Sequence, residues 1–177
     1  TSQYGILAAS TSFVSFGEMN ITARGGGNFQ GAYIYGTGTF KAVDNIIIDA
    51  ATSGGQWGLD FSNSRIMQST AGNISVTAVG SSGFYLDGDL IAGNHLTTPT
   101  AGGTITVNAT STSGYGFQSY TGSLISFGAA SITSRSTSNH AVIFNGTGAK
   151  LLSASDITIS GTQGTWGLTL YDNSFIQ

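Results

Sequence analysis

The sequence predicts an all-β protein, a right-handed parallel β-helix of about six to seven coils with three short strands per coil. Two observations carry this prediction. A phrase of about 26 residues recurs seven times in the 177-residue chain, and each copy alternates apolar and polar residues before a turn. A fixed period of this length is typical of repeat architectures. One proline and no helical period leave few other folds.

Each copy opens with a small residue and an apolar-x-apolar pair. The small residues serve as anchors and are Gly5, Ala32, Gly58, Gly83, Gly116, Ala141 and Gly167, at steps of 27, 26, 25, 33, 25 and 26 residues. A strand with period two places alternate residues on one face. We therefore expect Trp57 and Leu59 to share the apolar face of the third copy. Tyr33 and Tyr35 are assigned to that face in the second copy, and Asp60 to the opposite face.

Two further strands follow each opening. A turn rich in Gly, Ser, Thr, Asn and Asp comes first, and these residues tolerate positive φ or bond their own backbone. A second apolar patch then comes about eight residues after each anchor: Phe13-Val14, Phe40, Ile66-Met67, Leu90-Ile91, Leu124-Ile125, Leu151-Leu152 and Phe175-Ile176. A third strand begins with a polar residue followed by isoleucine, at Ile21, Ile46, Ile74, Ile105, Ile132 and Ile157.

Stacking of the coils predicts ladders of equivalent side chains, about 4.8 Å apart. The six isoleucines are expected to form one ladder. Tyr4, Trp57, Tyr115 and Trp166 form a second, and His140 is expected to stack at its end rather than to act as a base. The alternative fold is an antiparallel β-sandwich or propeller. It is disfavoured because blade repeats run near 40 residues and hairpins need two-residue turns at most corners.

Composition excludes several classes of function. Only 7% of the residues are charged, the net charge is -3, and the five basic residues are scattered, whereas phosphate binding needs clustered Lys and Arg. Nucleic acid is therefore not an expected partner. No apolar run reaches the length of a membrane-spanning helix in this segment. The chain has no cysteine, and the Gly-Gly-x-Gly-x-Asp pattern of calcium-binding rolls is absent. We expect no cofactor and no metal site.

One copy breaks the period. The fourth phrase is 33 residues long, and the excess lies in a loop insertion at about 93–103. In solenoids such insertions often build the binding surface. Asp87 and Asp89 precede the loop, and Asn94 and His95 lie within it. These four residues are the candidate contact site, for a glycan or a cation. The alternative is a tolerated loop beside a turn whose aspartates cap their own backbone.

The Asp and Glu residues give little support for an enzymatic function. Glycoside hydrolysis needs two carboxylates at a fixed separation. Asp60 and Asp87 lie one coil apart in the phrase and are the pair to consider, but no Arg or Lys accompanies them for lyase chemistry. We therefore expect no catalysis. The four Asn-x-Ser/Thr matches, at Asn20, Asn73, Asn108 and Asn145, are interpreted as polar ladders between coils.

The chain resembles the passenger region of bacterial exported adhesins, namely autotransporter passengers and filamentous-haemagglutinin-like proteins of two-partner secretion. The openings, the turns and third strands such as Asn73-Ile74-Ser75-Val76 and Asp156-Ile157-Thr158-Ile159 carry this architectural resemblance, which covers essentially the whole chain. It implies one β-helix segment over 1–177, part of a longer repeat protein. That protein is expected to be an extracellular or outer-membrane-surface stalk for adhesion, spacing or presentation of a terminal domain.

The resemblance also implies a partner class, a glycan or protein of a host or bacterial surface. Two alternatives stay open. One is a self-assembling filament subunit that associates end to end. The other is a carbohydrate-active enzyme or glycan-binding module.

Overall fold

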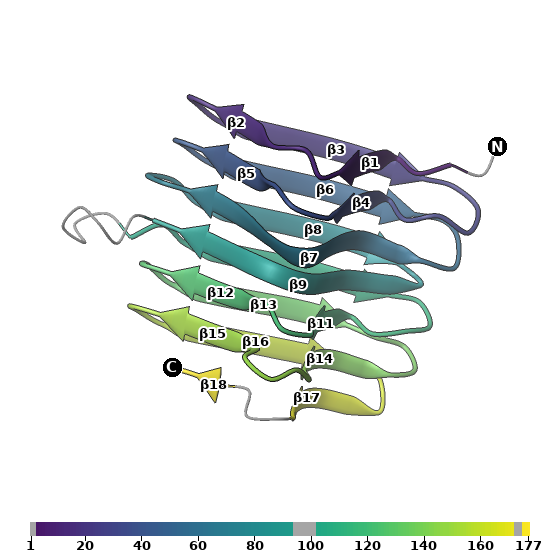
Figure 1. The fold of residues 1–177 in the computed structure, drawn as a ribbon. Helices are drawn as coiled ribbons and strands as arrows, with labels where there is room; N and C mark the ends of the chain where they lie inside the picture. The colour runs from purple at the N-terminus through teal and green to yellow at the C-terminus, as the bar shows by residue number, and fades with distance from the viewer. Residues whose placement is uncertain (1–2, 94–101, 172–174) are drawn as a thin grey trace.

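The computed structural model describes residues 3–93, 102–171 and 175–177 and shows an all-β stack of coils (Figure 1). The strands of the described residues are β1 (Ile6–Ala9), β2 (Phe13–Ser15), β3 (Met19–Gly25), β4 (Ala32–Tyr35), β5 (Thr39–Ala42), β6 (Ile46–Thr52), β7 (Trp57–Ser69), β8 (Ile74–Gly80), β9 (Ser82–Ala92), β10 (Ile105–Ser111), β11 (Phe117–Ser119), β12 (Ser123–Ser126), β13 (Ala130–Arg135), β14 (His140–Phe144), β15 (Lys150–Ser153), β16 (Ile157–Thr162), β17 (Trp166–Leu170) and β18 (Phe175–Ile176). The described part contains no helix that could span a membrane.

The strands stack in parallel on three faces. The first strands of the coils form the path β1-β4-β7-β9-β11-β14-β17, and the third strands form a separate sheet, β16-β13-β10-β8-β6-β3. β7 and β9 continue through the corner between the first and second faces, so each supplies both of these strands in its coil. The separate second strands, β2, β5, β12, β15 and β18, therefore belong to the same sheet as the first strands. The fold is a parallel β-solenoid of about six turns with three strands per coil, which confirms the predicted fold class.

The second anchor is Gly31 rather than Ala32, which corrects the expected register by one residue. Ile6 pairs with Ala32, and Ala32 pairs with Leu59. A Cβ atom on Gly31 would lie 2.5 Å from the Gly58 carbonyl oxygen, so the close approach of the next coil requires glycine there.

This shift exchanges the inward and outward side chains expected for β4. Ala32 and Ile34 point into the core and are fully buried, whereas Tyr33 and Tyr35 lie on the outer face and stack with ring centroids 4.5 Å apart. β4 carries apolar or aromatic residues at every position, so alternation alone could not tell its two faces apart.

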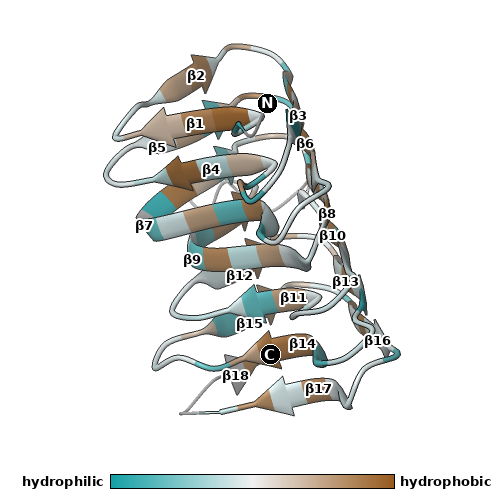
Figure 2. Cartoon of the chain, turned by 90° about the vertical axis from the view of Figure 1, so that its right-hand side faces the viewer, coloured by the Kyte–Doolittle hydropathy of each residue, from teal (hydrophilic) through white to brown (hydrophobic). Residues whose placement is uncertain are grey.

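The isoleucines expected in one ladder are distributed over two neighbouring register columns of the third face. One column contains Met19, Ile46, Ile74, Ile105, Ala130 and Ile157; the other contains Ile21, Ile48, Val76, Val107, Ile132 and Ile159. Ile21 and Ile132 therefore belong to the second column, not the first. Full burial of an isoleucine side chain stabilises the fold by about 1.5–3 kcal/mol. Figure 2 shows apolar and polar residues alternating along β7 and β9 beside these strands.

The aromatic ladder forms from the third coil to the C-terminal coil of the solenoid. Trp57 lies nearly parallel to Tyr115, with ring centroids 6.3 Å apart and an interplanar angle of 7°. His140 stacks on Tyr115 at 5.7 Å and on Trp166 at 6.2 Å. The histidine is stacked as expected, but inside the ladder rather than at its end. Tyr4 does not join this ladder and instead stacks on Tyr33 at 5.9 Å.

Serine and threonine hydroxyls tie neighbouring coils together at two corners. Between the second and third faces, Ser69 donates to the Asp44 carbonyl at 2.6 Å and Ser153 to the Gly128 carbonyl at 2.7 Å. Between the third and first faces, Ser136 donates to the Gly114 carbonyl at 2.6 Å. Each of these hydroxyls satisfies a carbonyl oxygen of the preceding coil, and so supports the turns of the stack.

Asparagine side chains add a short polar ladder at the start of the third face. Asn45 Oδ1 accepts the Asn73 backbone N–H at 3.0 Å, and Asn73 Oδ1 accepts the Thr104 backbone N–H at 2.8 Å. The predicted ladder role is confirmed for Asn73. Asn145 is also bonded between coils, because its Oδ1 accepts the Gln118 amide at 3.2 Å.

Arg65 is buried inside the solenoid, which the sequence did not predict. Two extra residues between Phe61 and Arg65, with Asn63 at a φ of 69°, shift the register and leave Arg65 on the same inward side as Phe61. Its guanidinium donates to the carbonyl of Gly36 at 2.9 Å and to that of Thr11 at 3.0 Å. One side chain therefore links three successive coils.

Candidate functional site

A buried carboxylate lies on the outer face of the first strands. Asp60 follows Tyr33 and precedes Tyr85 in one register column of β4, β7 and β9. The residue is only 9% exposed, and its Oδ1 atom has no hydrogen-bond partner. Its Oδ2 atom accepts the Gln30 side-chain N–H at 3.4 Å, a long contact. Buried carboxylates are ordinarily paired or fully hydrogen-bonded, so Asp60 is an exception in this fold.

The surroundings of Asp60 shift its acidity. Burial raises the pKa of Asp60 to about 6, and the negative charge of Asp87 adds to the shift, whereas hydrogen bonding by Ser62 and Gln30 opposes it. Burial also raises the pKa of Tyr85 to about 12, with further contributions from Asp87 and Asp60. Both shifts report a poorly solvated region of negative potential.

Aromatic rings surround this carboxylate. The Trp57 and Tyr85 rings are tilted at 47° with centroids 5.3 Å apart. Tyr33 lies on the other side of Asp60 in the column, and burial together with the Asp60 charge raises the pKa of Tyr33. We call Asp60, Tyr33, Trp57 and Tyr85 the Asp60 cluster. Each of the three aromatic residues is partly exposed, so the cluster reaches the solvent.

No Lys or Arg side chain compensates the cluster. The five Lys and Arg residues lie on other elements or point inward: Arg24 on β3, Lys41 on β5, Arg65 on β7, Arg135 on β13 and Lys150 on β15. Arg24 forms an ion pair with Asp49 on the third face, and Arg65 points into the core. The outer face around Asp60 is therefore aromatic and acidic.

The structure describes two of the four residues of the candidate contact site, Asp87 and Asp89. Asp87 accepts a hydrogen bond from the Thr121 hydroxyl and one from the Asn63 backbone N–H at 3.4 Å. Asp89 accepts one from the Ser123 backbone N–H at 3.0 Å. Thr121 and Ser123 lie in the next coil, so both aspartates bridge coils rather than cap their own turn. Asn94 and His95 lie outside the described residues.

Asp60 and Asp87 lie in adjacent coils, as the repeat predicts. Asp60 pairs with Tyr85, and Asp87 lies two residues farther along β9. Within the described ranges, no group of three or more His, Cys, Asp or Glu residues is arranged to hold a metal ion. The sequence reasoning missed the burial of Asp60. A carboxylate placed between tyrosines of successive copies was the available signal, and the one-residue error in β4 concealed it.

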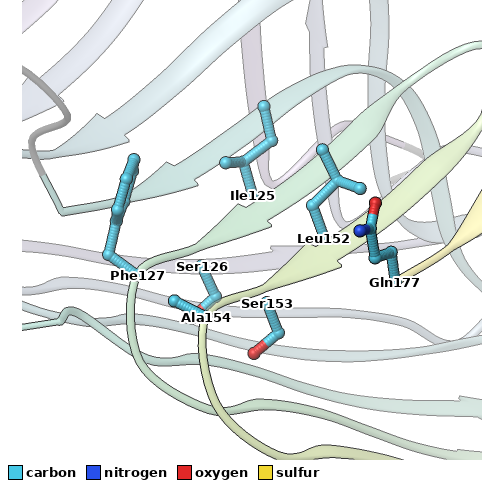
Figure 3. Close-up of a pocket in the computed structure, with 7 residues that line it drawn as sticks. All are labelled: Ile125, Ser126, Phe127, Leu152, Ser153, Ala154 and Gln177. Atoms are coloured by element: carbon cyan, nitrogen blue, oxygen red, sulfur yellow. The ribbon is translucent and has the colours of Figure 1, made fainter.

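A shallow hollow of about 270 Å³ lies on the second face near the end of the chain (Figure 3). Ile125, Phe127 and Leu152 supply its apolar wall, and Gln177 borders it. It contains no charged side chain and none of the predicted site residues.

The comparisons with known proteins give no relative from which a function could be transferred. No family model, no curated protein and no solved structure matches this chain.

Proposed function

We propose that this chain is a structural and adhesive stalk segment of an extracellular or surface-exposed bacterial protein, with no catalytic role. The observation that carries the proposal is the unbroken interior of the solenoid. The inward column of the second face, for example, contains Phe13, Phe40, Met67, Leu90, Leu124, Leu151 and Ile176. A stack filled in this way is a continuous rod rather than a container for a ligand.

The bonding between coils suits a load-bearing element. Most contacts of a coil are with its neighbours, so stability accumulates coil by coil and folding can propagate along the chain without ATP outside the cell. The corner hydroxyls of Ser69, Ser136 and Ser153 and the guanidinium of Arg65 add links between successive coils. These links lie along the axis on which a surface stalk is pulled.

Two measurements on the producing bacterium test the stalk proposal. Antibodies against this segment should label intact, unpermeabilised cells, and deletion of the segment should lower cell attachment while leaving growth unchanged. Labelling only after permeabilisation contradicts the surface location. Unchanged attachment of the deletion strain contradicts the adhesive role.

One observation favours a second candidate, end-to-end association into filaments. On β17, Trp166, Leu168 and Leu170 are 58%, 46% and 47% exposed, although Leu168 and Leu170 continue the fully buried positions Val142 and Phe144. A further coil on β17, of the same chain or of a second copy, would cover them, and the second copy is the filament proposal. Sedimentation of the isolated segment tests this: assemblies that are lost on Leu168→Glu support it, and uniform monomers at all concentrations refute it.

A further inference from the structure

The Asp60 carboxylate lies between Tyr33 and Tyr85 in its register column, with no Lys or Arg side chain to neutralise it. Oδ1 is buried and has no hydrogen-bond partner, and the side chains that hydrogen-bond the carboxylate, Gln30 and Ser62, are both neutral. An uncompensated buried carboxylate is costly in a folded protein. A cationic ligand would offset this cost, since no Lys or Arg side chain lies there between Tyr33 and Tyr85.

The rings beside Asp60 add to the attraction for a cation. An aromatic face carries a negative quadrupole and attracts ammonium groups within about 6 Å of the ring centroid. Trp57 and Tyr85 are tilted at 47° with ring centroids 5.3 Å apart, and Trp57 also lies parallel to Tyr115. Both rings are partly exposed, so a cation can approach them from the solvent, beside Asp60, which neighbours Tyr85 in the register column. Asp87, farther along β9, adds to the negative field of Asp60.

The same features disfavour other ligand classes. Anions are repelled because Asp60 and Asp87 face this surface and no Lys or Arg does. Small metal ions need several oxygen ligands, and within the described ranges no acid or histidine group of three is available. An alkylated ammonium group is satisfied by aromatic faces and a nearby charge without direct oxygen contact.

We propose that the Asp60 cluster is a binding site for an alkylated ammonium cation, with Trp57 and Tyr85 as the cage and Asp60 as the buried counter-charge. The site goes beyond the stalk function and does not depend on it. The ammonium group comes either from a lipid headgroup or from a free or side-chain ammonium, and the experiment separates these sources.

Fluorescence of Trp57 gives a direct readout. Trp166→Phe removes the only other tryptophan, which lies outside the cluster. Titration with choline chloride, against sodium chloride at equal ionic strength, is expected to give a saturable change in the folded Trp166→Phe protein. Asp60→Asn in this background keeps the shape of the side chain and removes its charge, and at least tenfold weaker choline binding is expected. Asp156→Asn, an exposed acid at the far end of the third face, is the matched control and should leave binding unchanged.

The pH profile separates a counter-charge from a packing role. The titratable groups that face Asp60 are Tyr33 on β4 and Tyr85 and Asp87 on β9. Because the pKa of Asp60 lies at about 6, choline affinity of the parent should fall as the pH drops through that value. The weak residual binding of Asp60→Asn should not follow pH in this range.

Vesicles of phosphatidylcholine identify the source of the cation. Co-sedimentation of the protein with these vesicles, abolished by Asp60→Asn, assigns a lipid headgroup. Choline binding without co-sedimentation assigns a free or side-chain ammonium. The proposal is overturned if choline gives no saturable change beyond that of sodium chloride. Equal choline affinity of Asp60→Asn and its parent overturns it as well.

Discussion

Replacement of Asp60 by asparagine is expected to stabilise the protein at neutral pH and to have little effect in acid. The folded protein holds the pKa of Asp60 at about 6, against an ordinary value of 3.8. The folded state therefore binds more protons than the unfolded state between these two values, and stability falls as the pH rises from about 4 to about 6. A shift of this size corresponds to about 3 kcal/mol of lost stability above the upper value.

Asp60→Asn removes the charge but keeps a polar side chain in the same place. Because the buried amide is itself imperfectly paired, the expected gain near pH 8 is about 1–3 kcal/mol rather than the full amount. Near pH 4 the parent carboxyl is protonated in the folded state, so the two proteins should converge.

Urea unfolding followed by circular dichroism, repeated across this pH range, measures the difference between the two proteins. Asp156→Asn serves as the control because Asp156 is exposed, and its curve should run parallel to that of the parent. Parallel curves for Asp60→Asn and the parent at every pH would refute the reasoning, because the buried charge would then have no energetic consequence.

Three further predictions concern the stack itself. Ile74→Ala, at a fully buried position in the centre of the third face, should lower the free energy of unfolding by about 2–5 kcal/mol. Ile159→Ala, on the half-buried strand β16, should lower it by clearly less. Equal losses in urea unfolding would contradict this difference in burial. Arg65→Met should leave buried carbonyls without donors, at about 1–3 kcal/mol each, and speed hydrogen exchange of the β5 amides; unchanged exchange would argue against the link between three coils. Ser126→Ala, which removes a hydroxyl bonded to the Gly103 and Ala129 carbonyls, should lower the midpoint of thermal unfolding more than Thr133→Ala on the exposed surface.

The architecture could be predicted because the repeat constrains many positions at once. Small anchors at Gly5, Gly58 and Gly83 and the turn residues after each opening recur where the backbone requires them. A Cβ atom on Gly58, for instance, would lie 2.4 Å from the Val79 nitrogen. Such steric demands appear in the sequence as glycine, and so the coil count and the three faces followed from it.

The register of individual strands could be predicted only where one face is clearly polar. β4, with Ala32, Tyr33, Ile34 and Tyr35, has no polar face, and the small Ala32 was mistaken for the anchor. The core accepts Ala32 because the neighbouring coils fill the space with larger side chains, which is a property of packing between coils and not of the local pattern.

The candidate site was less predictable for two physical reasons. The burial of Asp60 depends on the rings of Tyr33 and Tyr85 in other coils, and so on the register that was misassigned by one residue. Arg65 keeps the same inward parity as Phe61, because the irregularity between them inserts two residues and not one. Its burial is not expected from the sequence because an arginine is rarely buried completely, and its carbonyl partners come from other coils.

Equivalent residues of the described strands stack in parallel, one coil after another. Thr22, Asp49, Thr77, Asn108, Thr133 and Ser160 form one outward register column of the third face. The protein contains no cysteine, so pairs of spin labels can be attached at Thr22→Cys combined with a cysteine at each later position. Dipolar electron spin resonance should give separations that rise by about 4.8 Å per coil, to about 24 Å between positions 22 and 160. A separation that does not increase steadily along this series would contradict the solenoid.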